Sequence, residues 1–316
     1  MTDQASPYRH ESPPLVVVGV VALDTIETPH LRVEDLLGGG ATYFALAASL
    51  YGPVGMVSAV GSDFPPHYLN LLAQRGVDLA GVQTIPGATF RWACRYGRDW
   101  NHREVLELSP NAFSHFRPHL QKSPFLFLST MDPQLQLLAL QQRSQNTLTL
   151  VDTMDHWIRH QTEELGMVLA KAELVTLNEE EAHLMTDERD MAVAARNILR
   201  MGPKGVIVKK GNRGVTLFSA SQCWEVAAVP VAQVVDPTGA GDAFAGGVMG
   251  YLTAQGQVTE RTLAEALPHG AAVASLVVED WGVQGLLKGT RELVEQRRQA
   301  LAAPKAFPLP RAGRRQ

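Results

Sequence analysis

Cysteine is scarce in this sequence: its 316 residues include only Cys94 and Cys223, which lie far apart and show no spacing typical of metal ligands. Long apolar runs are missing too, since none approaches the ~18 residues that a membrane-spanning helix needs. The formal net charge is −4, which argues against a surface built mainly to bind nucleic acid. We therefore expect a reduced, cytoplasmic protein that binds neither nucleic acid nor membrane, and not a disulfide-rich secreted domain.

Short apolar segments rich in β-branched residues recur along the chain and alternate with helical patterns. The run LVVVGVV (15–21) is typical of a strand buried on both faces, and a helical pattern separates it from the next such run, 54–60. This alternation predicts an α/β fold with a doubly wound, mostly parallel sheet flanked by helices. Residues 82–108 instead alternate polar and apolar side chains, which predicts an antiparallel hairpin with one wet face. We expect a disordered tail at 1–14 and a loose Pro- and Arg-rich tail at 304–316.

The segment VVDPTGAGDAFAGGVMG (234–250) places many glycines at the start of a predicted helix, where they should weaken it. We predict a strand over 226–235 that Asp236 and Pro237 end, because proline disfavours the helical region for the residue before it. The glycine turn then leads into a helix over about 241–255. A helix N-terminus has unpaired N–H groups, and glycines let an anion approach them closely. The segment therefore predicts an anion-binding cradle.

Asp242 stands in the first turn of that helix, where the helix dipole favours its ionised form. A carboxylate beside an anion site suits a base that takes the proton of a hydroxyl attacking phosphorus, while the cradle stabilises the phosphoryl group. The structural alternative is a favourable first-turn acid with glycines for packing, which is the role we expect for Gly246, Gly247 and Gly250. A dinucleotide fingerprint lacks its third glycine here, and a Walker loop is excluded because Gly-Lys-Ser/Thr does not occur.

With these features, the sequence resembles the ribokinase/PfkB family of sugar and nucleoside kinases. DPTGAGDAFAGG is similar to the C-terminal signature of that family, and four other segments resemble family motifs in the family's order. They are VGVVALD (18–24), LGGGATYFALAASLYGPVGMVSAVGSDFP (37–65), TLNEEEA (176–182) and VKKGNRGV (208–215). The resemblance implies a ribokinase-like kinase domain over 15–303, with a small β-sheet lid from about 24–36 and 82–112.

The resemblance also implies an ATP-dependent phosphotransferase with an alcohol group as acceptor. Asp242 would be its catalytic base, and Gly239, Ala240 and Gly241 would form the anion hole for the γ-phosphate. Water would be excluded by the lid, because water competes with the acceptor hydroxyl.

Cation and nucleotide sites follow from the same resemblance. Asn178 and Glu181 would organise Mg²⁺ through water, although an N-cap asparagine with first-turn acids explains them structurally. Asp236 would help to bind K⁺, with carbonyls offered by Val277 and Gly282, or would only end a strand. The residues expected along ATP are Asn178, Lys209, Gly211, Gly214 and Thr238.

The substrate end of the site is implied by the first two motifs and the lid. Asp24 would bind two substrate hydroxyls, since a carboxylate at the end of an apolar strand is costly unless it is paired. Asp152 borders the site with no assigned role. Arg91 either presents charge to the substrate or is a solvated cross-strand residue. The glycines that would let the substrate approach the backbone are Gly38, Gly39 and Gly40. The apolar lid residues that would pair with a second subunit in a homodimer are Phe90, Trp92 and Tyr96.

Two departures from the family pattern bear on the substrate. Many relatives have Asn at the position of Tyr43, and many sugar kinases have Asn at the position of Ala22. Both losses remove polar contacts to a bare sugar, whereas an aromatic ring at Tyr43 could stack on a nucleoside or be buried packing. We expect a kinase for a small sugar or polyol, with a nucleoside kinase as the alternative and a catalytically silent ligand-binding relative as a further one.

Overall fold

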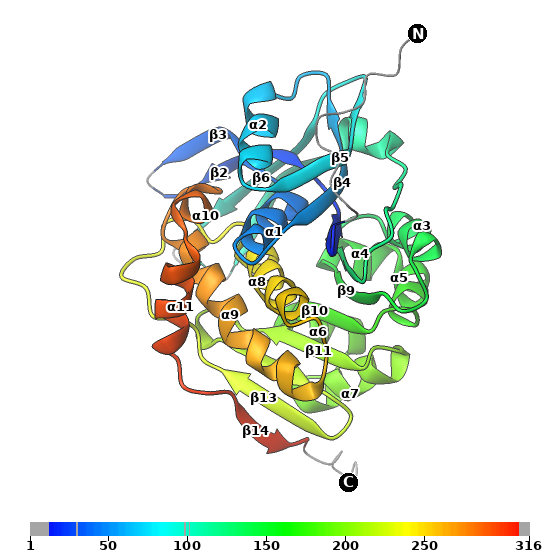
Figure 1. Ribbon diagram of the computed structural model, residues 1–316, viewed down its shortest axis with the longest axis vertical. Coiled ribbons are helices and arrows are strands. Elements are labelled where there is room, and N and C mark those ends of the chain that lie inside the picture. Colours follow the sequence, from blue (N-terminus) through cyan, green and yellow to red (C-terminus); the bar gives the residue numbers. More distant parts are fainter. Residues whose placement is uncertain (1–12, 30, 98, 101, 310–316) are drawn as a thin grey trace.

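Two β-sheets organise the described part of the chain, which comprises residues 13–29, 31–97, 99–100 and 102–309 of a computed structural model (Figure 1). The strands are β1 Leu15–Val18, β2 Ala22–Glu27, β3 Arg32–Gly38, β4 Val54–Gly61, β5 Val77–Ile85, β6 Phe90–Tyr96, β7 Arg103–Ser109, β8 Phe125–Leu128, β9 Leu148–Asp152, β10 Leu174–Asn178, β11 Gly205–Lys209, β12 Val215–Phe218, β13 Gln222–Val226 and β14 Lys305–Pro308. The helices are α1 Gly40–Ser49, α2 Pro66–Gln74, α3 Pro133–Gln142, α4 Asp155–His160, α5 Thr162–Leu169, α6 Glu179–Thr186, α7 Met191–Met201, α8 Ala240–Gln255, α9 Glu260–Val278, α10 Gln284–Lys288 and α11 Arg291–Gln299, with short 3₁₀ helices η1 Asn111–His115 and η2 Gly211–Arg213.

The larger sheet contains ten of the described strands, in the order β14-β13-β12-β11-β10-β9-β8-β1-β4-β5. Every neighbouring pair from β11 to β5 is parallel, and β12, β13 and β14 extend the sheet in antiparallel pairs. Helices α1, α8 and α9 cover the near face of this sheet in Figure 1. The prediction of a doubly wound, mostly parallel sheet flanked by helices is therefore confirmed.

The first strand shows why these apolar runs form buried strands. Side chains alternate between the two faces of a strand, and both faces of β1 are covered by helices. Val17 belongs to the same buried cluster as Phe44 of α1. Val16 and Val18 belong to a second cluster with Ala139 of α3 on the opposite face. A continuous apolar run is what a strand covered on both sides requires.

The smaller sheet has the order β3-β2-β6-β7 and carries the predicted hairpin as β6 and β7. The hairpin was predicted to start at residue 82, and this is wrong. Residue 82 lies in β5, which pairs in parallel with β4 at the edge of the large sheet. Asp24 lies inside β2 of the small sheet, and not at the end of the first strand as the motif suggested. The carboxylate is thus carried by the lid.

Two other boundaries differ from the sequence-based expectation. The strand predicted over 226–235 ends at Val226, and no helix or strand is described from there to the start of α8. Pro230 cannot donate to a strand ladder, and the apolar residues of this loop line a cavity instead. The predicted tail 304–316 is wrong in its first part, since β14 pairs with β13. Residues 1–12 and 310–316 lie outside the described residues.

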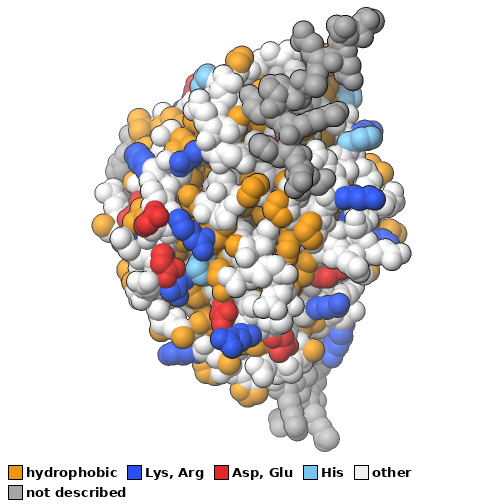
Figure 2. Space-filling model, viewed as in Figure 1, with side chains coloured by type: hydrophobic (Ala, Val, Ile, Leu, Met, Phe, Trp, Pro, Cys, Tyr) orange, Lys and Arg blue, Asp and Glu red, His pale blue; other side chains and the backbone are white. Residues whose placement is uncertain are grey.

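The surface carries charges of both signs, as the small net charge of −4 suggests. On the face shown in Figure 2, acidic and basic side chains are interspersed between small apolar patches. Within the described residues, no helix combines the length and apolar character needed to cross a bilayer.

Helix α8 depends on its glycines for close packing, as predicted for Gly246 and its neighbours. A Cβ atom added to Gly246 would lie 2.5 Å from the Phe44 carbonyl oxygen and 2.7 Å from the Ala47 Cβ, both in α1. The backbones of α1 and α8 can approach this closely only because the side chain is missing.

We predict that Gly246→Ala lowers the free energy of unfolding by about 1–3 kcal/mol, because the new methyl group forces α1 and α8 apart. Gly166→Ala is the matched control: Gly166 lies in α5 with no atom within 4 Å of an added Cβ. It should instead stabilise by about 0.5–1 kcal/mol through helix propensity. Urea unfolding measures both, and an unchanged midpoint for Gly246→Ala would contradict the packing role.

Candidate active site

A cavity of about 1480 Å³ opens between the small sheet and the carboxyl ends of the large sheet's strands. Ligands in open α/β sheets bind in such a crevice, outside the carboxyl ends of the strands. The predicted site residues that line it are Asp24, Gly39, Gly40, Tyr43, Asp152, Asn178, Glu181, Lys209, Gly211, Gly214, Thr238, Gly239, Ala240, Gly241 and Asp242. Residues from all five motifs therefore converge, whereas Gly38, Arg91 and Asp236 are not among the lining residues.

Asp242 occupies the first turn of α8 and faces the cavity. Burial, and next the charge of Asp152, raise the pKa of Asp242 to about 6, while Lys209 and a hydrogen bond from Ser129 lower it. The Ser129 Oγ donates to Asp242 Oδ1 over 3.3 Å. A Cβ atom at Gly40 would lie 2.5 Å from the same oxygen, so α1 begins directly against this carboxylate. The result is a carboxylate that is ionised at neutral pH and able to accept a proton.

The residues of the predicted anion hole lie at the start of α8. Gly239 is the N-cap residue with φ 76°, a left-handed conformation that favours glycine, and an added Cβ would overlap the ring of Tyr43. The Ala240 N–H donates to the Pro237 carbonyl over 3.1 Å. The Ala240 N–H group is therefore not free to bind an anion. The N–H groups that remain for the predicted anion hole are those of Gly239, Gly241 and the first turn of the helix.

A buried ion pair adds positive charge beside this hole. Lys209 Nζ lies 3.0 Å from Asp152 Oδ2, and their side chains are 20% and 5% exposed. The same Nζ would be 3.1 Å from a Cβ at Gly241. Burial lowers the pKa of Lys209, but Asp152, Glu181 and Asp242 together raise it above its ordinary value. Lys209 is therefore a cation beside Gly241 at the start of α8, and Asp152 holds it there.

Asn178 and Glu181 form a capping box at the start of α6. The Asn178 Oδ1 accepts from the Glu181 N–H, and the Glu181 Oε2 accepts from the Asn178 N–H, both over 2.8 Å. The structural reading of this motif is thus present, and both residues also line the cavity. Burial raises the pKa of Glu181 to about 7, against a lowering by Lys209. Within the described residues, no three His, Cys, Asp or Glu side chains are close enough together to hold a metal ion directly.

Asp24 and Tyr43 bring two unpaired polar atoms to the other end of the cavity. Asp24 is 2% exposed and Tyr43 is 1% exposed, yet Asp24 Oδ1 and the Tyr43 hydroxyl have no hydrogen-bond partner. Burial, and next the charge of Asp236, raise the pKa of Asp24 to about 8. Buried polar atoms in this state are costly unless a ligand or water satisfies them. A Cβ at Gly38 would overlap the Asp24 carboxylate, so that glycine makes room for it and not for a substrate.

Asp236 has the structural role that the sequence left as an alternative. It is fully buried, its Oδ1 accepts from the Thr238 N–H at 2.9 Å, and its Oδ2 accepts from the Gly282 N–H at 3.1 Å. These bonds tie the loop before α8 to the loop after α9.

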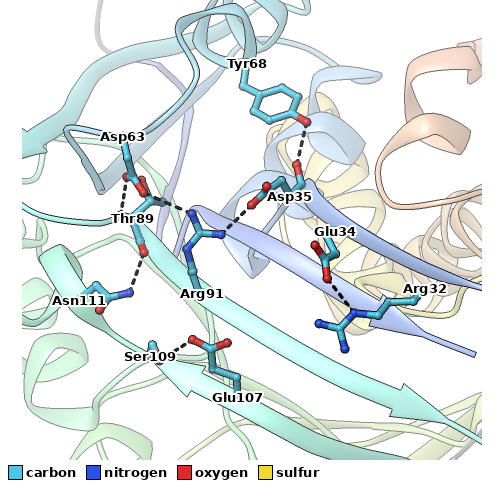
Figure 3. Close-up of polar contacts among 10 residues, drawn as sticks. All are labelled: Arg32, Glu34, Asp35, Asp63, Tyr68, Thr89, Arg91, Glu107, Ser109 and Asn111. Carbon is cyan, nitrogen blue, oxygen red and sulfur yellow. Dashed lines mark hydrogen bonds and ion pairs between the residues drawn. The ribbon is translucent and has the colours of Figure 1, made fainter.

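Arg91 lies outside the cavity, in the solvated arrangement that was the alternative reading (Figure 3). Its Nη1 is 2.6 Å from Asp35 Oδ1, and its Nη2 is 3.4 Å from Asp63 Oδ2. Asp63 also accepts from the Thr89 N–H and hydroxyl, both at 2.6 Å. Because Arg91 follows Phe90, strand alternation turns it to the outer face of the lid.

The apolar face of the lid points into the cavity. Phe90 and Trp92 of β6 and Leu108 of β7 line it beside Asp24, to which Trp92 is the register partner. Phe90, Trp92 and Tyr96, which we expected to pair with a second subunit, line the cavity, and the homodimer stays a prediction. The cavity wall around Asp24 is therefore largely aromatic and aliphatic.

Sequence reasoning missed three residues at the site. Ser129 follows β8 and bonds Asp242; its signal is a polar residue directly after a buried strand. The Tyr96 hydroxyl lies 3.2 Å from the Thr238 Oγ1, next to the predicted anion hole. Arg103 opens β7 and lines the cavity. The last two come from the lid, and no local pattern shows how far its hairpin reaches.

Comparisons with known proteins show the family of the chain. A family model described as pfkB family carbohydrate kinase matches residues 17–288. A cytidine kinase from Thermococcus kodakarensis is 32% identical over 277 residues, which is 85% of this chain and 97% of that protein.

Two solved structures share the fold. A nucleoside kinase from Burkholderia thailandensis in complex with inosine has a TM-score of 0.74 and 21% identity, covering 90% of this chain and 98% of that one. An E. coli protein assigned as a ribokinase II, in complex with ATP and Mg²⁺, has a TM-score of 0.75 and 22% identity, covering 91% and 99%.

The two deeply buried aspartates should respond oppositely to replacement by asparagine. Asp24 takes up a proton on folding because its pKa is raised from 3.8 to about 8. The free energy of unfolding that is lost by burying the ionised Asp24 carboxylate is zero below about pH 4. This loss grows as the pH rises to about 8 and is constant above that. We predict that Asp24→Asn stabilises the protein by about 1–3 kcal/mol at pH 8 and not at pH 4.

Asp236→Asn is the matched control, because both carboxylate oxygens accept backbone N–H bonds. An amide there sets an NH₂ group against an N–H donor and should destabilise by about 1–3 kcal/mol at pH 8. Urea unfolding at the two pH values measures both variants. A destabilised Asp24→Asn protein at pH 8 would show that the carboxylate is satisfied in the folded state.

Proposed function

The chain belongs to the pfkB family of carbohydrate kinases and is a phosphotransferase acting on a hydroxyl group; from this premise we propose that it transfers the γ-phosphate of ATP to a ribonucleoside. The observation that carries the proposal is the pair of unpaired atoms on Asp24 and Tyr43 beside an apolar lid wall. The diol of a ribose suits the two unpaired atoms, and a nucleobase suits the apolar wall.

The transfer step assigns one task to each group around Asp242. The acceptor hydroxyl gives its proton to the Asp242 carboxylate while its oxygen forms a new bond to the γ-phosphorus. The bond from that phosphorus to the β,γ-bridging oxygen breaks, and its electron pair leaves with ADP. Ser129 holds the Asp242 carboxylate in place through its hydrogen bond. A pKa of about 6 leaves this base ionised at neutral pH without making it too weak to accept the proton.

The γ-phosphate is bound by the N-terminus of α8 and by Lys209. Gly239 and Gly241 line the cavity and would offer their N–H groups to the developing negative charge, and the Lys209 ammonium lies beside Gly241. Glu181 and Asn178 fit a Mg²⁺ ion held through water, because a buried carboxyl with a raised pKa gains from a nearby cation. An ion held there would neutralise phosphate charge. We propose no K⁺ site at Asp236, whose oxygens both accept N–H bonds.

The substrate class follows from the contrast between the unpaired polar atoms of Asp24 and Tyr43 and the apolar lid wall beside them. A small sugar or polyol carries a hydroxyl on most of its carbons and would cover little of the apolar surface of Phe90, Trp92 and Leu108. A base can stack on such side chains, and stacking contributes about 1–3 kcal/mol per base. The similarity to a cytidine kinase along nearly its full length supports the same class. A small sugar is the second candidate, supported by the carbohydrate kinase description of the matched family.

Replacing the base tests the chemistry. We expect Asp242→Asn to bind ATP normally but to lose about 10²-fold or more in kcat, the scale of general-base catalysis. In the wild-type protein, kcat/KM should rise with pH through an apparent pKa of about 6, because only the ionised carboxylate accepts the proton. ADP release and calorimetric ATP binding measure these effects. Turnover of the variant within a few fold of wild type would remove Asp242 from the mechanism.

Tyr43→Phe tests the substrate class, because it keeps the ring against Gly239 and removes only the unpaired oxygen. ADP release should be found with ribonucleosides and be weak with free ribose or inositols. On ribonucleosides, kcat/KM of Tyr43→Phe should fall about tenfold, the value of one buried hydrogen bond, and fall less on deoxyribonucleosides.

Tyr251→Phe is the control for this substitution, since it removes a hydroxyl that contacts Glu265 away from the cavity. It should leave kcat/KM unchanged. Turnover of sugars but not of nucleosides would establish the second candidate in place of the first.

A further inference from the structure

A buried amide side chain joins two strand ends that border the site. Gln136 lies in α3 and is 1% exposed, although glutamine is mostly found at protein surfaces. Its Nε2 donates to the Ser129 carbonyl over 3.0 Å and to the Asp152 carbonyl over 2.9 Å. Both hydrogens of the amide are therefore used to connect the ends of β8 and β9.

The connection is made one residue beyond the last pairing of these two strands. β8 and β9 are parallel, and their final register pair is Leu128 with Val151. After this pair the chain enters two loops, whose first residues Thr130 and Thr153 line the cavity. Gln136 therefore holds the two strands together where their own ladder has ended.

Each of the two connected residues holds one of the charged groups assigned to the reaction. The Ser129 Oγ donates to Asp242 Oδ1 over 3.3 Å. Asp152 Oδ2 lies 3.0 Å from Lys209 Nζ. Gln136 is thus separated by a single residue from the proposed base on one side and from the phosphate-side cation on the other.

The surroundings of Gln136 make this connection costly to lose. α3 packs on the face of the large sheet opposite α8, in an apolar cluster that includes Leu135 and Ala139. In so apolar a place a hydrogen bond is stronger than in water, and a carbonyl that loses its donor is left unsatisfied. Among the described residues the Gln136 Oε1 has no partner, so the two N–H bonds are what this side chain contributes.

We propose that Gln136 is a positioning residue for phosphoryl transfer. By connecting the ends of β8 and β9, it fixes the distance between the Asp242 carboxylate and the Lys209 ammonium. This inference rests on the proposed kinase mechanism and adds to it a residue that is not among those lining the cavity. The acceptor oxygen must be in line with the phosphorus while its proton goes to Asp242, so a small displacement of either charged group slows the reaction.

Gln136→Met tests the proposal, because methionine keeps the length of the side chain and removes its donors. Gln142→Met is the matched control. Gln142 also lies in α3, and its Nε2 also donates to two backbone carbonyls, those of Pro118 at 2.9 Å and Leu138 at 3.2 Å. Neither Gln142 nor Pro118 lines the cavity.

We expect both variants to lower the urea midpoint of unfolding, but only Gln136→Met to lose kcat, by about tenfold to 10²-fold. The calorimetric affinity for ADP and the KM for the nucleoside should stay within a few fold of wild type. The apparent pKa of kcat/KM should rise above its wild-type value, because the hydrogen bond from Ser129 lowers the pKa of Asp242 and would be weakened. Gln142→Met should keep both the wild-type kcat and the wild-type pH profile.

A double-mutant cycle separates positioning from a general loss of stability. Ser129→Ala removes the hydrogen bond to Asp242 and should itself lower kcat. Because Gln136 acts through Ser129, Gln136→Met should lower kcat less in the Ser129→Ala protein than in wild type. An equal loss in both proteins would overturn the proposal, and so would a wild-type kcat for Gln136→Met.

Gln136→Glu serves if the methionine variant does not fold. Glutamate has the shape of glutamine but lacks the two amide N–H groups, so kcat should again fall while Gln142→Glu keeps it. Circular dichroism checks that both proteins are folded. A folded Gln136→Glu protein with wild-type turnover would also rule out the positioning role.

This inference and the proposed function fail separately. If wild type phosphorylates sugars and no nucleoside, the substrate class is wrong, and the same comparisons made with that sugar still test Gln136. If Asp242→Asn keeps its turnover, the mechanism itself is wrong. If Asp242→Asn is inactive but Gln136→Met and Gln142→Met have equal kcat, Gln136 is only structural.

Discussion

The site depends on one constraint: several buried carboxylates line one cavity, and one buried lysine faces them. Burial raises the pKa of Asp24, Glu181 and Asp242, so each of them opposes folding to some degree at neutral pH. Lys209 lowers the pKa of Glu181 and Asp242 and is held by Asp152. The large sheet, buried on both faces, supplies the stability that makes such a cavity tolerable.

The same constraint explains the order of the elements around the cavity. Asp152, Asn178 and Lys209 end three neighbouring parallel strands, β9, β10 and β11, so their side chains meet at one edge. Asp242 comes from a helix whose close packing on α1 requires Gly246. The small sheet brings Asp24 and the apolar side chains of Phe90, Trp92 and Leu108 to the same cavity.

Tyr43 shows how a departure from a family pattern acquires a physical reason. Its ring lies against Gly239, whose missing side chain leaves room for it, and its hydroxyl is buried without a partner. Tyr43 therefore packs against the N-cap glycine of α8 and also brings an unpaired oxygen to the cavity. The sequence showed the substitution but could not show that both consequences belong to one residue.

What the sequence determined by itself is local. Apolar β-branched runs specified the strands of the large sheet, and the glycine-rich start of α8 predicted an anion site with Asp242, because these patterns act over a few residues. The tertiary structure decided which long-range partners each segment met. The run after Val226 is as apolar as a strand but lines the cavity, residues 305–308 pair with β13, and Arg91 and Arg103 point to opposite faces of the lid. Those outcomes depend on register and on neighbours distant in the chain, and no short stretch of sequence contains either.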